Sequence, residues 1–190
     1  VHAIEAFTSK LKRNPLSSLL AREALRLLCG NLHQAVHDGT NREARQAMLL
    51  GACLAGQAFA NAPVAAVHAL AYPLGGHFHI PHGLSNALVL PHVLRFNAEA
   101  AAPLYAELAP LLLGERLRPG NAHSLTGQFV DELAALGPRC GLPSRLRDAG
   151  VPQDCLEQLA CDAMQQQRLL VNNPREVSQA DALAIYRAAY

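Results

Sequence analysis

The chain has 190 residues and a formal net charge of +1, and half of its residues are hydrophobic, with only five Phe, four Tyr and no Trp. This length predicts one domain, and an excess of Ala and Leu over β-branched residues favours helix over sheet. Lys and Arg are spread along the chain, so no basic stripe indicates a nucleic-acid partner. No apolar run reaches the roughly 18 to 20 residues that span a bilayer, so we expect no membrane partner and a cytoplasmic location.

The start of the chain already has the character of a helix interior, from Val1 to Phe7, with no capping residue and no Met before it. We therefore expect further residues upstream in the natural protein. After a break at Asn14-Pro15, leucines from residue 17 to 37 are spaced for one buried helical face. Asp38-Gly39 is expected to end that helix.

Residues 40–43, Thr-Asn-Arg-Glu, have the spacing of a capping box with Thr40 as the cap, which predicts a helix running to about Ala60. Small residues along this helix, Gly51 and Gly56 among them, would let another backbone approach closely. We expect it to be central and buried. A short helix from Pro63 should end near Tyr72, where Pro73 and then two glycines follow.

Pro81-His82-Gly83 predicts the start of another helix, running through Asn97 with a kink at Pro91. The later elements are expected as helices over 98–113, 124–136, 144–149, 153–167 and, with a capping box at Ser178 and Asp181, 178–190. No strand is followed by a glycine-rich phosphate turn, so the sequence contains no dinucleotide-binding fingerprint.

The five cysteines are odd in number, include no C-x-x-C pair, and are predicted to be reduced and mostly buried: Cys29, Cys53, Cys140, Cys155 and Cys161. Five of the nine histidines fall between His68 and His92. His68 inside one helix and His82 at the start of the next could supply two imidazoles to a first-row metal ion. The alternative interpretation, solvated or hydrogen-bonded structural histidines, stays open for this cluster. His77 and His79 are expected to be exposed or to line a cleft.

The sequence from Val67 to Asn97 resembles the iron-containing (group III) alcohol dehydrogenase family. The resemblance is carried by Val67-His68-Ala-Leu-Ala-Tyr72-Pro73-Leu74-Gly75, Pro81-His82-Gly83-Leu-Ser-Asn86-Ala87, Leu90-Pro91-His92-Val93 and Phe96-Asn97. Further similarity covers the rest of the chain, at His2-Ala3-Ile4-Glu5, Phe59-Ala60-Asn61-Ala62, Asn173-Pro174-Arg175 and Ile185-Tyr186.

The resemblance implies an all-α, bundle-like metal-binding domain of the dehydroquinate synthase-like or iron-containing alcohol dehydrogenase type. Residues 1–190 would form that single domain, and an N-terminal nucleotide-binding domain would be absent from this chain. The family's three metal-binding histidines fall on His2, His68 and His82, and its fourth ligand, an Asp, would lie just upstream of Val1. The implied ion is Fe²⁺ or Zn²⁺.

What the family implies about activity is hydride transfer between an alcohol and an aldehyde or ketone, with NAD(P) bound through the missing domain, in a homo-oligomer. This chain alone should then be inactive. Tyr72 stands where the family often has a further histidine thought to help proton transfer, so Tyr72 is the candidate catalytic residue, or else a packing residue. Two other functions stay open for this sequence. One is a non-enzymatic helical metal-binding or interaction module, and the other is a metal hydrolase with Glu5 or Glu43 as general base.

Overall fold

The computed structural model describes all 190 residues, and every regular element in it is a helix, as expected. The α-helices are α1 (His2–Thr8), α2 (Pro15–His37), α3 (Arg42–Asn61), α4 (Ala66–Phe78), α5 (His82–Leu113), α6 (Ala122–Arg139), α7 (Leu156–Ala163), α8 (Gln167–Leu170) and α9 (Gln179–Ala189). Short 3-10 segments lie at Gly114–Arg116, Arg147–Ala149 and Gln153–Cys155.

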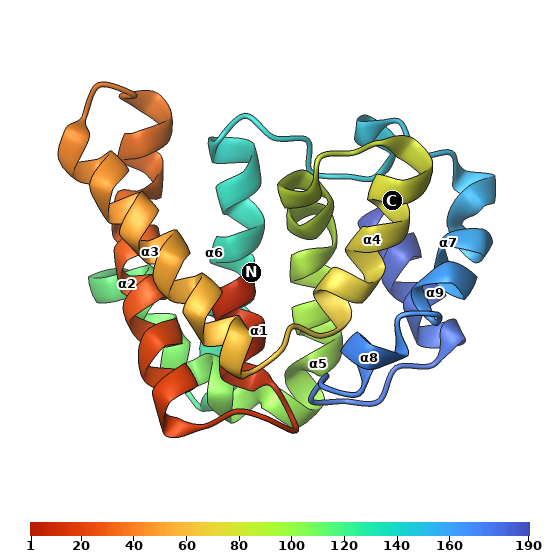
Figure 1. Cartoon of the computed structure of the whole chain (residues 1–190), viewed down its shortest axis with the longest axis horizontal. Helices are drawn as coiled ribbons and strands as arrows, with labels where there is room; N and C mark the ends of the chain where they lie inside the picture. Colours follow the sequence, from red (N-terminus) through yellow and green to blue (C-terminus); the bar gives the residue numbers. More distant parts are fainter.

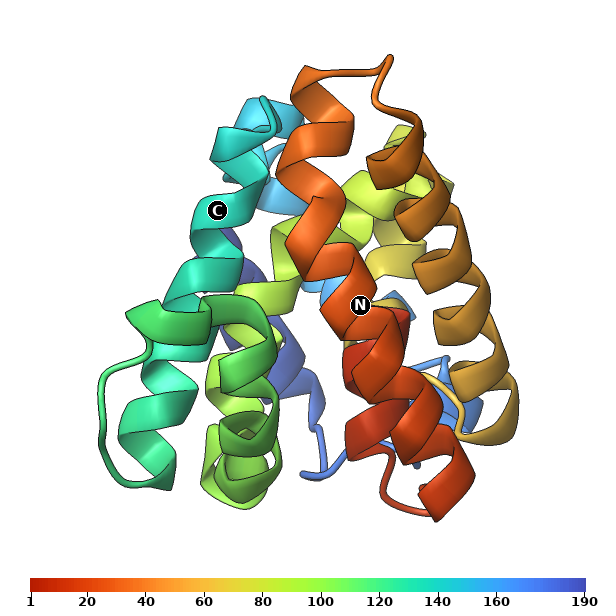
Figure 2. The same cartoon turned by 90° about the vertical axis from the view of Figure 1, so that its left-hand side faces the viewer.

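The helices form one bundle in which α4 and α5 occupy the middle (Figure 1). The α2–α3 hairpin forms one end of the bundle, and α7, α8 and α9 form the other. Turned by 90°, the structure shows α2 beside α3 and α6 beside α5 (Figure 2), the two helix pairs that pack most extensively. The short α1 packs against α2, α3 and α5, which brings the first residues of the chain into the core.

Of the two capping boxes predicted at helix starts, one is present and the other is not. The Ser178–Asp181 capping box is confirmed, because each side chain accepts a hydrogen bond from the backbone N–H of the other. The predicted capping role of Thr40 is wrong. Thr40 donates its hydroxyl to the carboxylate of Asp38 at 2.7 Å, so Asn41 caps α3 instead, accepting from the N–H of Ala44 at 2.9 Å.

The two central helices are longer than predicted: α4 does not end at Pro73, and α5 does not end at Asn97. Helix α4 continues through Pro73 to Phe78, and residues predicted as two helices form the single 32-residue α5, which contains Pro91, Pro103 and Pro110. A proline inside a helix costs about 3 kcal/mol, since it removes a hydrogen bond and crowds the preceding turn. Both helices bury apolar residues along their length, and this tertiary packing outweighs the local cost.

Helix α3 was predicted to be central and buried, but it lies at one end of the bundle against α2. Its small residues do permit a close approach at one point: a Cβ atom added at Gly51 would lie 2.8 Å from Cγ of Leu28. Its outer face carries the exposed side chains of Leu49 and Leu50. On α2, Leu19 was predicted on the buried face and is also exposed, because α2 has few partners beyond α3 on that side.

All five cysteines are free thiols, as predicted, but the expectation that most are buried is wrong. Cys53 is exposed and the other four are half-buried. Burial is strongest for Cys29, where it raises the pKa of the thiol to about 11.

No single helix is long and apolar enough to cross a bilayer. Helices α3 and α4 reach the required length and hydropathy only when they are taken together, and they are bent by 108° relative to each other.

The core of the bundle contains two buried tyrosines that differ in one respect. Tyr186 donates its hydroxyl to the backbone oxygen of Leu70 at 2.6 Å, whereas the hydroxyl of Tyr105 has no partner. Burial raises the pKa of both phenols, so both stay protonated. Since α4 also carries His68, the bond from Tyr186 fixes the helix that presents the candidate site.

The substitution Tyr186→Phe is expected to lower the free energy of unfolding by about 1 kcal/mol, through the lost hydrogen bond. Tyr105→Phe should leave it unchanged within about 0.5 kcal/mol or raise it, because that hydroxyl is desolvated without compensation. Urea unfolding of the two variants measures the difference. Equal losses in both would show that the bond to Leu70 contributes nothing.

Candidate metal centre

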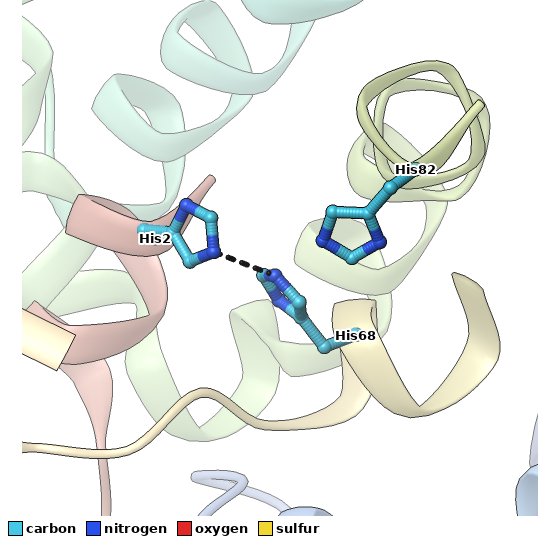
Figure 3. Close-up of side chains that lie close together, drawn as sticks. All are labelled: His2, His68 and His82. Carbon is cyan, nitrogen blue, oxygen red and sulfur yellow. Dashed lines mark hydrogen bonds between the residues drawn. The ribbon is translucent and has the colours of Figure 1, made fainter. Parts of the chain in front are cut away.

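Three histidines that are far apart in the sequence converge between α1, α4 and α5 (Figure 3). His2 is the first residue of α1, His68 lies in α4, and His82 is the first residue of α5. One ring nitrogen from each lies within 4.8 Å of the others. The structure therefore brings together all three residues predicted as metal ligands.

The orientation of His68 is set by a buried carboxylate. Its ring is 2% exposed, and its Nδ1 lies 2.6 Å from Oε2 of Glu5, whose other oxygen accepts the N–H of Val67 at 2.7 Å. Because a carboxylate only accepts hydrogen bonds, Nδ1 of His68 carries the proton and donates it. Nε2 of His68 is then unprotonated, and its lone pair points into the space between the histidines. A histidine that binds a metal ion needs such an unprotonated nitrogen.

His2 and His82 flank this ring. Nε2 of His2 lies 3.1 Å from Nε2 of His68, and its ring stacks on Phe59 at 4.5 Å between centroids. Burial lowers the pKa of His2 to about 4, with further lowering by His68, the amino terminus and His82. Burial also lowers the pKa of His82, with a further electrostatic contribution from the nearby His68. Both imidazoles are therefore neutral at pH 7.

Asn86 completes the ring of side chains around the site. It lies one helical turn after His82, is 3% exposed, and places Nδ2 at 3.1 Å from Nε2 of His82 and 3.5 Å from Nε2 of His68. Its Oδ1 is buried and has no hydrogen-bond partner. The sequence showed Asn86 and Glu5 inside family motifs, and Glu5 also as a possible base, but gave neither residue a place in the metal site. Their spacing, i+4 from His82 and i+3 from His2, was the signal available.

Tyr72 lies beside the site without belonging to the histidine cluster. It follows His68 by one helical turn and is half-buried, with its ring centroid 6.3 Å from that of His68 and 6.0 Å from that of His82. His77 and His79 are exposed, as expected, and His77 pairs with Asp162 on α7 at 2.6 Å. Neither histidine belongs to the cluster of His2, His68 and His82.

The two acids considered as hydrolytic bases are poorly placed for that role. Both oxygens of Glu5 are engaged, and they lie on the Nδ1 side of His68, away from Nε2. Glu43 is exposed in the first turn of α3. Phe59 on the same helix stacks on His2, and Glu43 comes sixteen positions before Phe59, which puts Glu43 about 24 Å from the site along the helix.

The donor set suits a first-row divalent ion. Neutral imidazoles are common ligands of Zn²⁺ and Fe²⁺, and three of them on packed helices leave at least one position of a four-coordinate ion for another group. The amide oxygen of Asn86, buried beside the three rings with no hydrogen-bond partner, fits a site that binds a polar or cationic group. Fold and donor set together define an all-α domain with a candidate metal centre.

Comparison with known proteins places this domain. A model of the Fe-containing alcohol dehydrogenase family, C-terminal, matches residues 1–190. The chain is 42% identical over 189 residues to long-chain-alcohol dehydrogenase 1 of Geobacillus thermodenitrificans (strain NG80-2), and 37% identical to 1,3-propanediol dehydrogenase of Klebsiella pneumoniae. These matches cover 100% of this chain but 47% and 48% of the relatives. The chain thus spans about half the length of the curated relatives it matches.

Solved structures agree with this placement. The crystal structure of 1,3-propanediol oxidoreductase superposes with a TM-score of 0.94 at 36% identity, covering 100% of this chain and 49% of that one. Maleylacetate reductase from Rhizobium sp. strain MTP-10005 superposes with a TM-score of 0.83 at 28% identity, covering 100% of this chain and 49% of that one. The chain belongs to the Fe-containing alcohol dehydrogenase family and corresponds to its C-terminal, all-α domain.

The lowered pKa values of His2 and His82 predict how metal affinity depends on pH. A free histidine begins to take up protons near pH 6.5, in competition with a metal ion. Because the pKa of His2 is about 4, this ring stays neutral as the pH falls through 6.5, and the lowered pKa of His82 delays the protonation of the second ring. Zinc titrations by calorimetry should show nearly constant affinity from pH 8 to 6 and a loss toward pH 4. A steep loss already between pH 7 and 6 would contradict this picture.

Proposed function

We propose that this chain is the metal-binding half of a metal-dependent alcohol dehydrogenase. The reaction is hydride transfer between an alcohol and NAD(P), giving an aldehyde or ketone, with Fe²⁺ or Zn²⁺ held by His2, His68 and His82. The observation that carries the proposal is the convergence of three imidazoles, two of them kept neutral by burial, in a chain of this family.

Each residue of the site has a distinct role in this proposal. A bound ion would supply Lewis-acid chemistry, polarising the oxygen of the alcohol or carbonyl substrate. Glu5 holds His68 in the tautomer that offers Nε2. Tyr72, one turn from His68 and half-buried, is placed to pass a proton between the substrate hydroxyl and solvent.

The nicotinamide cofactor needs a second partner. This chain has no strand and no glycine-rich phosphate turn, so nothing in it resembles a dinucleotide site. We propose that NAD(P) is bound by an N-terminal nucleotide-binding domain, with the alcohol held between the two domains, in a homo-oligomeric enzyme. The relatives are named for long-chain alcohols and for 1,3-propanediol, which points to a primary alcohol as the class of substrate.

A second candidate is a non-enzymatic metal-binding module. It is favoured by one observation: all three imidazoles come from this chain, so an ion could be held here without another domain. The two functions differ in whether the metal-loaded chain supports hydride transfer once it is joined to a nucleotide-binding domain.

The deciding experiment fuses this chain behind the N-terminal half of the Klebsiella pneumoniae 1,3-propanediol dehydrogenase, its relative at 37% identity. The metal-loaded chain alone should form no NAD(P)H from 1,3-propanediol or a long-chain alcohol. The fusion should form it, and the same fusion carrying His82→Ala should not. A fusion that binds both metal and NAD(P)⁺ yet transfers no hydride would contradict the enzymatic function and favour the module.

A further inference from the structure

The side-chain amide of Asn86 occupies a position that an orienting hydrogen bond alone does not explain. It is buried between two imidazoles, with Nδ2 within hydrogen-bond reach of Nε2 of both His82 and His68. Because Nδ1 of His68 carries the proton shared with Glu5, Nε2 of His68 is a lone pair. The amide therefore faces the lone pairs that a metal ion would use.

The distances among these atoms match those between ligands of one ion. Two atoms that are each about 2.1 Å from a shared ion, at the angles of tetrahedral or octahedral coordination, lie about 3.0 to 3.5 Å apart. The amide group of Asn86 lies 3.1 Å from Nε2 of His82 and 3.5 Å from Nε2 of His68. Nε2 of His2 lies 3.1 Å from Nε2 of His68. These three pairwise distances among the four groups are thus already at inter-ligand spacing, and the three imidazole nitrogens all lie within 4.8 Å of one another.

Metal binding would reverse the electrostatics felt by this amide. Without an ion, the NH₂ group donates toward imidazole lone pairs; with an ion on those lone pairs, the same NH₂ would face a cation. A rotation of 180° about the last side-chain bond exchanges NH₂ for Oδ1, which is a good ligand atom. Oδ1 now has no partner, so no hydrogen bond made by the oxygen resists the rotation.

We propose that Asn86 is a further metal-site residue, whose amide turns on metal binding and presents Oδ1 to the ion beside the three histidines. This inference rests on the proposed metal centre and adds a protein oxygen to a set of imidazole nitrogens. It also gives the orphaned oxygen of Asn86 a partner.

Cobalt(II) titration followed by visible absorption tests the proposal, with Asn86→Leu and Asn86→Asp as a matched pair of similar volume. Leu offers no oxygen, and we expect it to weaken Co²⁺ binding about tenfold or more and to alter the absorption bands. Asp offers an oxygen and should bind at least as tightly as the unchanged chain. Asn97→Ala is the control, because Asn97 is another buried amide of α5 that pairs with Asn173 instead.

Each outcome separates the proposal from its foundation. If the unchanged chain binds no Co²⁺, the metal centre itself fails. If it binds and Asn86→Leu matches it in affinity and spectrum, or Asn86→Asp is as weak as Asn86→Leu, the role of Asn86 fails while the centre stands. Nuclear magnetic resonance of the unchanged chain avoids any folding defect: Zn²⁺ should shift the carboxamide signals of Asn86 and leave those of Asn97 in place. Unmoved Asn86 signals in the zinc-bound chain would overturn the proposal.

Discussion

His68→Ala is expected to abolish metal binding and to lower the free energy of unfolding by about 3 to 5 kcal/mol. The ring is fully enclosed and is the partner of a carboxylate that is itself 3% exposed. Removing one member of a buried, hydrogen-bonded pair leaves the other without compensation, which is costly. Urea unfolding in the presence of a chelator measures the stability change free of any metal contribution.

His82→Ala is the matched control for that result. His82 is also a predicted ligand, but it is exposed at the first turn of α5 and has no carboxylate partner. It should weaken metal binding while changing the free energy of unfolding by less than about 1 kcal/mol. If His82→Ala destabilised the chain as much as His68→Ala, the buried pair with Glu5 would not be the source of the loss.

Glu5→Gln is expected to lower metal affinity by about 10- to 100-fold, although Glu5 is not itself a proposed ligand. This range is typical of groups that orient metal-binding histidines. Glu5 accepts two N–H groups, from Val67 and from His68, and Gln has only one acceptor oxygen. When that oxygen serves Val67, the NH₂ group faces His68 and favours the tautomer with its proton on Nε2. That proton blocks the nitrogen that a metal would bind.

Nitrogen-15 resonances of the histidine ring report this tautomer directly. We expect His68 to be protonated on Nδ1 in the unchanged chain and on Nε2 in Glu5→Gln. Glu43→Gln, at the exposed start of α3, should change neither the tautomer nor the affinity. A Glu5→Gln chain that kept both the Nδ1 proton and full affinity would show that Glu5 has only a packing role.

Local patterns in the sequence were enough to predict the all-α class and most helix starts. Asn14 and Ser178 cap helices because their side chains accept hydrogen bonds from backbone N–H groups three residues later. Such contacts depend only on residues that are close in the sequence. The end of α4 at Pro73 and the end of α5 at Asn97 were predicted wrongly, because packing with distant segments decides how far these two helices extend. The cap at Thr40 failed for a similar reason at shorter range, since Asp38 competes for its hydroxyl.

Part of the candidate site could likewise be predicted from the sequence, and part depends on how distant segments pack. The positions of His2, His68 and His82 followed from resemblance to a family, and their convergence depends on packing of α1 against the start of α4 and α5. The contact between Glu5 and His68 joins residues 63 apart in the sequence, and no periodicity encodes it. Asn86 shares a helix face with His82, which was visible, but its buried and unpaired oxygen appears only once α4 packs beside α5.

The central claim is that His2, His68 and His82 together hold one divalent ion. Calorimetric titration of the chain with Zn²⁺ at pH 7, beside a His2→Ala/His82→Ala variant, tests it most directly, since both replaced rings are at least partly exposed and their loss should spare the fold. We predict one bound ion per unchanged chain and none in the variant. An unchanged stoichiometry and affinity in the variant, or no binding by either protein, would contradict the claim.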